Sequence, residues 1–226
     1  MKNFIICLSR IEASLTTAIE LKNQLEAYGA DVELFEGTYG SDAAVMMKTE
    51  RRTIHPVGIK GNPLDPGEPH DPEVQYSPGI QGCFYSHYRL WQKCVELNEP
   101  IIIWEDDIVL TRPYQPIDWT DVLVLALGHP GKTDKYRHYL DTPEGEPKAS
   151  DYYQASMPGN CGYAIKPHAA KKLLEVYSKT YLKADNAINQ HHVIIQIHNY
   201  VMGIALTKKE GKRSLTNAKH FWTDFK

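Results

Sequence analysis

The sequence contains no long apolar segment, no C-x-x-C pair and no internal repeat. Its longest apolar runs have four to seven residues, far short of the roughly 20 that span a bilayer. The first ten residues have a short apolar run without the small residues of a cleavage site, so we predict a strand there and not a signal peptide. The four cysteines show no metal-binding or disulfide spacing, which indicates reduced thiols and a cytoplasmic location.

Charge is distributed unevenly along the chain. With 226 residues, 42% of them hydrophobic, the chain can bury one substantial core, and we predict a single domain over residues 1–226. Residues 1–165 carry 14 basic and 24 acidic side chains, a net −10, whereas residues 166–226 carry 11 and 4, a net +7. The basic segment 207–226 is interpreted as a solvated tail or as a clamp for a phosphate-bearing ligand. The acidic remainder argues against a dedicated nucleic-acid binder, although the basic quarter permits a nucleic-acid acceptor.

The pattern of apolar residues predicts an α/β protein. Residues 3–8 and 31–35 are predicted strands, and residues 11–28 between them form an amphipathic helix that ends at Gly29. Strand, helix and strand within about 35 residues make a βαβ unit, which predicts a mostly parallel central sheet flanked by helices. Further predicted elements are helices at 77–97 and 167–181 and strands at 100–104, 122–127, 162–166 and within 192–206. Residues 56–78, with six prolines, and 128–156 are predicted long loops.

An apolar strand runs directly into three acidic residues, Glu105, Asp106 and Asp107. The strand is predicted to be buried on both faces, and ligands bind at the carboxyl ends of strands in open α/β sheets. Three adjacent carboxylates repel one another and are costly to desolvate, and a divalent cation is the usual compensating charge. The sequence therefore predicts a metal-assisted site at this strand end, with a solvated strand end as the alternative.

Several segments, in order along the chain, resemble glycosyltransferase family 25, which includes lipooligosaccharide and collagen galactosyltransferases. The strongest likeness is the motif G-C-x-x-S-H-x-x-L-W at 82–91, followed by the strand that ends in E-D-D at 105–107. Weaker likenesses are Leu8-Ser9-Arg10, Glu36 to Gly40, Asn160 to Leu174, and the positions of Asp185 and Ser214.

The resemblance implies a GT-A-like fold with a Rossmann-like domain. It also implies an enzyme that moves a hexose, galactose or glucose, from a UDP-sugar to a hydroxyl acceptor, expected to be a glycan, with inversion at the anomeric carbon. The implied cofactor is Mn²⁺ or Mg²⁺, because a divalent cation neutralises the leaving diphosphate. Asp107 is then the predicted direct ligand. Glu105 reaches the metal through water or holds a donor hydroxyl, and Asp106, on the other side of the strand, supports the donor site.

The resemblance also implies donor contacts near the first two strands and on the motif helix. Arg10 would reach the base or the phosphates and Glu36 the nucleoside; the alternatives are an exposed arginine and a turn cap. Ser86 shares a helix with His87. That histidine is interpreted as a donor contact, as a group that orients an acidic residue, or as a satisfied core histidine.

Two further groups complete the predicted site. Arg213 and Ser214, with the neighbouring Lys212, would close over the diphosphate. Asp185 is the predicted general base that takes the proton of the acceptor hydroxyl, with a helix N-cap as the alternative. Weaker candidates for the base or for a further metal ligand are His191, His192, His198 and His220.

Other interpretations stay open beside the transferase. The chain is alternatively a catalytically degenerate nucleotide- or sugar-binding protein, a transferase that acts on modified nucleic acid, or a metal-dependent phosphohydrolase. The last would need further acidic or histidine ligands at short spacing, which the sequence does not supply. Four loop tyrosines are interpreted as a sugar-stacking platform or as packing residues: Tyr136, Tyr139, Tyr152 and Tyr153.

Overall fold

The computed structural model describes residues 1–55, 77–110, 113, 118–127, 156, 160–197 and 203–205. The strands in these ranges are β1 (Lys2–Cys7), β2 (Asp31–Glu36), β3 (Thr53–Ile54), β4 (Ile101–Glu105), β5 (Ile108–Leu110), β6 (Val122–Leu127), β7 (Asn160–Ile165), β8 (Thr180–Tyr181), β9 (Ile195–Ile197) and β10 (Gly203–Ala205). The helices are α1 (Glu12–Ala27), α2 (Gly40–Thr49), α4 (Pro78–Leu97), α6 (Pro167–Val176) and α7 (Ala184–Ala187).

A central mixed sheet organises the described part of the chain. Its order is β2-β1-β4-β7-β6-β10-β5, with β9 paired to β6, and β3 and β8 form a separate two-stranded sheet. β1 is parallel to β2 and β4, and β6 is parallel to β9 and β10, whereas β7 and β5 run antiparallel to their neighbours. Four of the seven pairings in the large sheet are therefore parallel. The predicted α/β fold with a mostly parallel sheet flanked by helices is confirmed.

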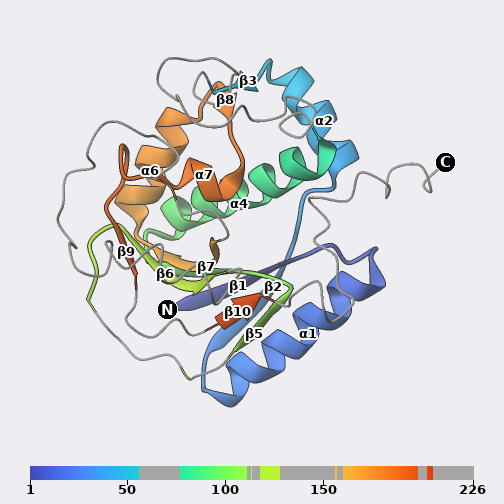
Figure 1. The fold of residues 1–226 in the computed structure, drawn as a ribbon, viewed down its shortest axis with the longest axis vertical. Helices are drawn as coiled ribbons and strands as arrows, with labels where there is room; N and C mark the ends of the chain where they lie inside the picture. The colour runs from blue at the N-terminus through green and yellow to red at the C-terminus, as the bar shows by residue number, and fades with distance from the viewer. Residues whose placement is uncertain are drawn as a thin grey trace.

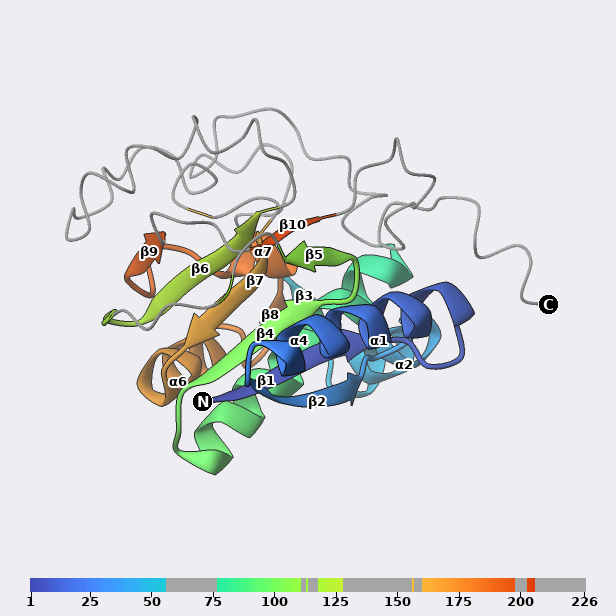
Figure 2. The same cartoon turned by 90° about the horizontal axis from the view of Figure 1, so that it is seen from below.

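Helices cover both faces of this sheet (Figure 1). α1 lies on one face, and α2, α4 and α6 lie on the other; Figure 2, seen from the α1 side, shows α1 in front of the strands. Successive residues of a strand face opposite layers, so β4 divides its side chains between two cores. Ile101 and Ile103 join the core under α4, while Ile102 and Trp104 join the core under α1. All four are at most 3% exposed, which confirms the prediction of a strand buried on both faces.

Local signals set the ends of the helices. Ser77 caps α4, since its hydroxyl accepts a hydrogen bond from the Ile80 N–H at 3.4 Å, and Pro78 occupies the first turn, where its missing N–H costs nothing. Gly29 adopts φ +80° directly after α1, as the sequence predicts for a helix terminus. No helix within the described ranges is both long enough and apolar enough to cross a membrane.

The structure corrects several predicted boundaries. α2, β3 and β5 have no counterpart among the predicted elements. The helix expected over 167–181 ends at Val176, because residues 180–181 leave it to pair with β3. A two-residue strand carries too little pattern to be recognised without its partner, and this partner lies more than 120 positions away.

Candidate functional site

The site lies where the order of the sheet reverses. The chain passes from β1 to β2 through α1 on one face, and then returns through α4 on the other face to place β4 on the opposite side of β1. Strands with helices on opposite faces leave a crevice beyond their carboxyl ends, which is where open α/β sheets bind ligands. Register places Glu105 beside Ile6 and Glu36 beside Cys7, so acidic residues flank the end of β1 on both sides.

The three acidic residues after β4 point in different directions. Asp106 faces the start of α1, where its carboxylate accepts a hydrogen bond from the Ser14 hydroxyl. The same hydroxyl accepts from the Leu8 N–H at 2.8 Å, so Asp106 ties the turn after β1 to the acidic turn. Glu105 faces the opposite layer, as the alternation of the strand requires, and its side chain is 35% exposed. Asp107 is half-buried in the turn that leads into β5.

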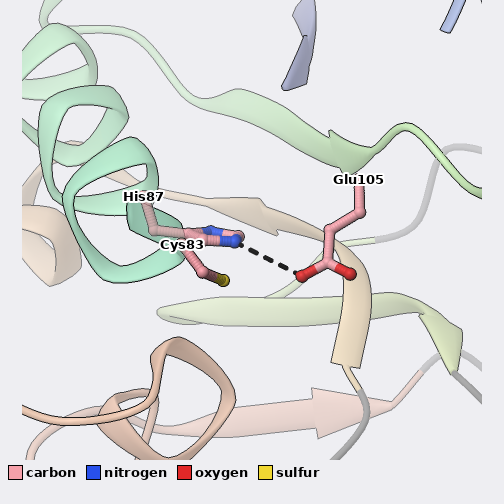
Figure 3. Close-up of side chains that lie close together, drawn as sticks. All are labelled: Cys83, His87 and Glu105. Carbon is pink, nitrogen blue, oxygen red and sulfur yellow. Dashed lines mark ion pairs between the residues drawn. The ribbon is translucent and has the colours of Figure 1, made fainter. Parts of the chain in front are cut away.

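Glu105 faces a buried histidine on α4 (Figure 3). Oε1 of Glu105 lies 3.6 Å from Nε2 of His87, whose side chain is only 3% exposed. The other ring nitrogen, Nδ1, lies 2.9 Å from the hydroxyl of Tyr163, which also accepts a hydrogen bond from Nε1 of Trp91 at 2.9 Å. Burial is the main cause of the raised pKa of Tyr163, so its hydroxyl keeps its proton. His87 is thus buried, with Nδ1 engaged by Tyr163 and Nε2 facing Glu105; its role toward the donor or the acidic residue stays a prediction.

Residues after β1 and β2 form a second, exposed group. The N–H of Ser9 donates to Glu36 at 3.2 Å, and the N–H of Arg10 donates to the Tyr39 hydroxyl at 2.7 Å. The Arg10 guanidinium lies 4.7 Å from the centre of the Tyr39 ring, in cation–π contact. Burial acts to raise the pKa of Glu36, but hydrogen bonds from Ser9 and Tyr39 outweigh it, and the pKa lies below its ordinary value. An ionised carboxylate and an oriented guanidinium therefore lie beyond the carboxyl ends of β1 and β2.

Ser86, on α4, holds the segment after β2 against that helix. It is 2% exposed; its hydroxyl donates to the Gly82 carbonyl at 2.7 Å and accepts from the Thr38 N–H at 2.8 Å. Arg89 adds bonds to the Glu36 carbonyl at 3.0 Å and to the Thr38 hydroxyl at 3.2 Å. The hydroxyl of Ser86 is thereby engaged with the backbone on both sides, and its predicted donor contact stays a prediction.

Asp185 lies in α7, which packs against α4. It is 8% exposed and forms an ion pair with Lys183, with Nζ 3.2 Å from Oδ2. Lys183, not Asp185, occupies the N-cap position, so the alternative role of Asp185 as a helix cap is wrong. The charge of Asp185 is the main cause of the raised pKa of Lys183. Burial, followed by the charges of Glu105 and Asp185, raises the pKa of the Cys83 thiol well above its ordinary value, which shows that these groups share one electrostatic environment.

The other predicted site residues contribute less. His191 is exposed, and His192 packs near Tyr177 with a pKa lowered to about 4, first by burial and then by His55 and His191. The following residues lie outside the described part of the chain: His198, Lys212, Arg213, Ser214, His220 and the four loop tyrosines.

Sequence reasoning missed three residues of this site. Cys83 precedes His87 by one helical turn, a spacing that a search for cysteine pairs does not detect. Lys183 stands two positions before Asp185, yet a lysine in a polar stretch has no special signal. Tyr163 looks like any strand aromatic, because its partners come from α4, more than 70 positions away.

Comparison with known proteins agrees with the motifs at this site. The model of glycosyltransferase family 25, described as an LPS biosynthesis protein, matches residues 1–118, which include the motif helix and the acidic strand end. The chain belongs to this family. The family-25 chain is 26% identical over 140 residues to the lipooligosaccharide biosynthesis protein lex-1 of Haemophilus influenzae, a match to 55% of the chain and 46% of lex-1. It is also 26% identical over 145 residues to the lipooligosaccharide biosynthesis protein lic2B of H. influenzae, a match to 59% of the chain and 48% of lic2B.

The matched part of the family-25 chain thus spans about half the length of these curated relatives. Among solved structures, mouse xyloside xylosyltransferase 1 in its apo form aligns with 87% of the chain and 71% of its own length, at 12% identity and a TM-score of 0.28. A score that low carries no conclusion about the fold.

Proposed function

We propose that this chain is a metal-dependent, inverting glycosyltransferase that moves a hexose from a UDP-sugar to a hydroxyl acceptor, a glycan in lipooligosaccharide or lipopolysaccharide synthesis. The observation that carries the proposal is the acidic turn 105–107, which follows β4 at the point where the sheet reverses. Membership of family 25 and relatives named for lipooligosaccharide biosynthesis support it. The cytoplasmic location expected from the sequence belongs to the same proposal.

The donor would lie across the carboxyl ends of β1, β2 and β4. Arg10 is exposed and oriented by the Tyr39 ring, which suits contact with the diphosphate or the base. Glu36 is held ionised by its hydrogen bonds, which suits acceptance of hydroxyl donors from a ribose. The segment after Glu36 is tied to α4 through Thr38, and the backbone N–H of Arg10 is tied to the same segment through the Tyr39 hydroxyl. The nucleotide would therefore meet a preformed surface.

The acidic turn suits a hard divalent cation. Carboxylate oxygens are the ligands that Mn²⁺ and Mg²⁺ prefer, and the half-buried side chains of Asp107 and Glu105 carry them. A bound cation would neutralise the negative charge that develops on the diphosphate. Asp106 is committed to Ser14 and would hold the turn in place behind these ligands.

Asp185 would act on the acceptor. In an inverting transfer the acceptor oxygen forms a bond to the anomeric carbon while the bond from that carbon to the diphosphate oxygen breaks, and UDP departs. The acceptor proton passes to a carboxylate, for which Asp185 stays the candidate. Lys183 would orient that carboxylate through its ion pair, and α7 brings both to the α4 side of the crevice, near Cys83.

Calorimetric titration of UDP, with and without Mn²⁺, tests the donor site. We expect binding that requires Mn²⁺ and that Asp107→Asn removes, because the substitution deletes a charged ligand while keeping the shape of the side chain. Asp42→Asn, at an exposed acidic residue in the first turn of α2, is the matched control and should bind as the wild type does. No UDP binding in either condition would refute the UDP-sugar proposal and favour the phosphohydrolase.

Transfer is tested separately with UDP-galactose and UDP-glucose and a truncated lipooligosaccharide acceptor. Formation of a product whose anomeric configuration is opposite to that of the donor would support the proposed reaction. Asp185→Asn should abolish this product while leaving Mn²⁺-dependent UDP binding unchanged. Metal-dependent UDP binding without transfer to any acceptor in the wild type would instead identify a degenerate binding protein.

A further inference from the structure

Three side chains of different chemistry converge beside the acidic turn (Figure 3). Cys83 and His87 stand one turn apart on the same face of α4, and Glu105 reaches toward them from the end of β4. Their sulfur, nitrogen and oxygen ligand atoms all lie within 4.8 Å of one another. In a tetrahedral zinc site, bonds of about 2.0–2.3 Å place the ligand atoms roughly 3.3–3.8 Å apart. From separations of up to 4.8 Å, the cluster needs at most about 1.5 Å of closure to reach that geometry.

His87 has one ring nitrogen, Nε2, that can bind a metal ion, because Nδ1 is already engaged. The side chain of His87 is 3% exposed, and within the described ranges Nε2 makes no hydrogen bond, with Glu105 at 3.6 Å as its near neighbour. Nδ1 is engaged by the Tyr163 hydroxyl, which already accepts the Trp91 N–H. A phenol oxygen has two acceptor sites and one proton, so Tyr163 can also accept Nδ1–H. That tautomer leaves a lone pair on Nε2, and a partner on the second nitrogen is the usual support of a metal-bound histidine.

The charge around the cluster also favours a cation. The carboxylates of Glu105, Asp107 and Asp185 all act on the Cys83 thiol, and among the described residues Lys183 acts on it in the opposite sense. A divalent cation would compensate this excess and bind the thiolate directly. The combination of sulfur, imidazole and carboxylate suits zinc and similar cations, whereas Mn²⁺ and Mg²⁺ prefer oxygen ligands alone.

We propose that Cys83, His87 and Glu105 form a binding site for a zinc-class divalent cation, next to the hard-cation site predicted at Asp107. The three residues supply three ligands and leave the fourth position for water. Glu105 would be shared between the two sites, so a cation held by Cys83 and His87 would withdraw Glu105 from the acidic turn. The proposal stands on these three residues and does not depend on the transferase activity.

Cobalt titration of the full chain, after treatment with a chelator, tests this site. Co²⁺ bound by a thiolate gives a sulfur-to-metal charge-transfer band in the near ultraviolet and, in tetrahedral geometry, strong visible bands. We expect the charge-transfer band and the visible bands to reach full intensity at one equivalent of Co²⁺ and to disappear when Zn²⁺ is added. Cys83→Ser should lose the charge-transfer band. Cys94→Ser is the matched control, since it makes the same change three turns further along α4 in a buried thiol.

The supporting tyrosine gives a second variant that keeps all three ligands. Tyr163→Phe should retain the sulfur band but weaken Co²⁺ binding about 10- to 100-fold, as loss of the partner of a metal-bound histidine does. Circular dichroism of each variant confirms folding. Wild-type protein that binds no Co²⁺, binds it without a sulfur band, or keeps the band after Cys83→Ser would overturn the proposal. None of these measurements involves UDP, so their failure is distinct from failure of the proposed function.

Discussion

Replacing Gly82 by alanine tests how closely α4, which carries the motif at 82–91, packs against the turn after β2. A Cβ at this position would lie 2.5 Å from the Thr38 carbonyl oxygen and 3.2 Å from the Gly40 nitrogen. Both neighbours are backbone atoms, which cannot rotate away as a side chain can. One of the two segments must therefore move by roughly 0.7–0.9 Å, and overpacking of this kind costs about 1–3 kcal/mol.

Part of that cost is offset by helix propensity. Alanine is about 1 kcal/mol better than glycine inside a helix, so the net loss of unfolding free energy should be at most about 2 kcal/mol. For a chain of this size 1 kcal/mol lowers the midpoint of thermal unfolding by about 2–4 °C, which predicts a fall of up to about 8 °C by calorimetry. Gln92→Ala, exposed on the same helix, is the control and should leave the midpoint almost unchanged.

The same substitution should also weaken UDP binding, because the displaced turn carries Glu36 and Tyr39. A midpoint that rises in Gly82→Ala would show that the helix and the turn do not approach this closely, because only the gain in helix propensity would then remain. A lower midpoint with unchanged UDP affinity would show that the turn is structural and does not belong to the donor site.

Three further substitutions test other contacts. Ser86→Ala should cost about 1–3 kcal/mol in urea unfolding, because it leaves the buried Thr38 N–H without its acceptor; no loss would contradict that bond. Gly162→Ala should lower the thermal midpoint, since its Cβ would lie 2.5 Å from the Trp104 ring; an unchanged midpoint would refute that contact. Burial acts to raise the pKa of Asp121, but hydrogen bonds and a nearby lysine outweigh it and lower the pKa below its ordinary value. Its stabilising effect is therefore present above about pH 4 and lost as the pH falls through the lower folded value. The midpoint of Asp121→Asn should accordingly be lower than that of the wild type at pH 7 and should converge with it as the pH falls through the lowered folded pKa of Asp121; a difference independent of pH would refute this.

The sequence was sufficient to predict the elements that carry a strong local pattern. The apolar run before Glu105 predicted a doubly buried strand, the stripe of α4 predicted a helix, and the first βαβ unit predicted parallel pairing of β1 with β2. α2 and the pair β3–β8 escaped prediction, because their stability comes from packing against α4 and from pairing between distant segments.

What the sequence by itself determined is the chemistry at the strand end: three consecutive carboxylates after a strand, and a helix that carries Cys83 and His87 one turn apart. These follow from order along the chain and from the periods of strand and helix. Only the tertiary structure decided which carboxylate meets which partner. The alternation of β4 sends Glu105 to α4, the turn sends Asp106 to α1, and packing of α7 brings Lys183 and Asp185 close to Cys83. The reason is physical, since these contacts join segments separated by 18 to 102 positions, and such pairs meet only when the layers of the fold close over a common sheet.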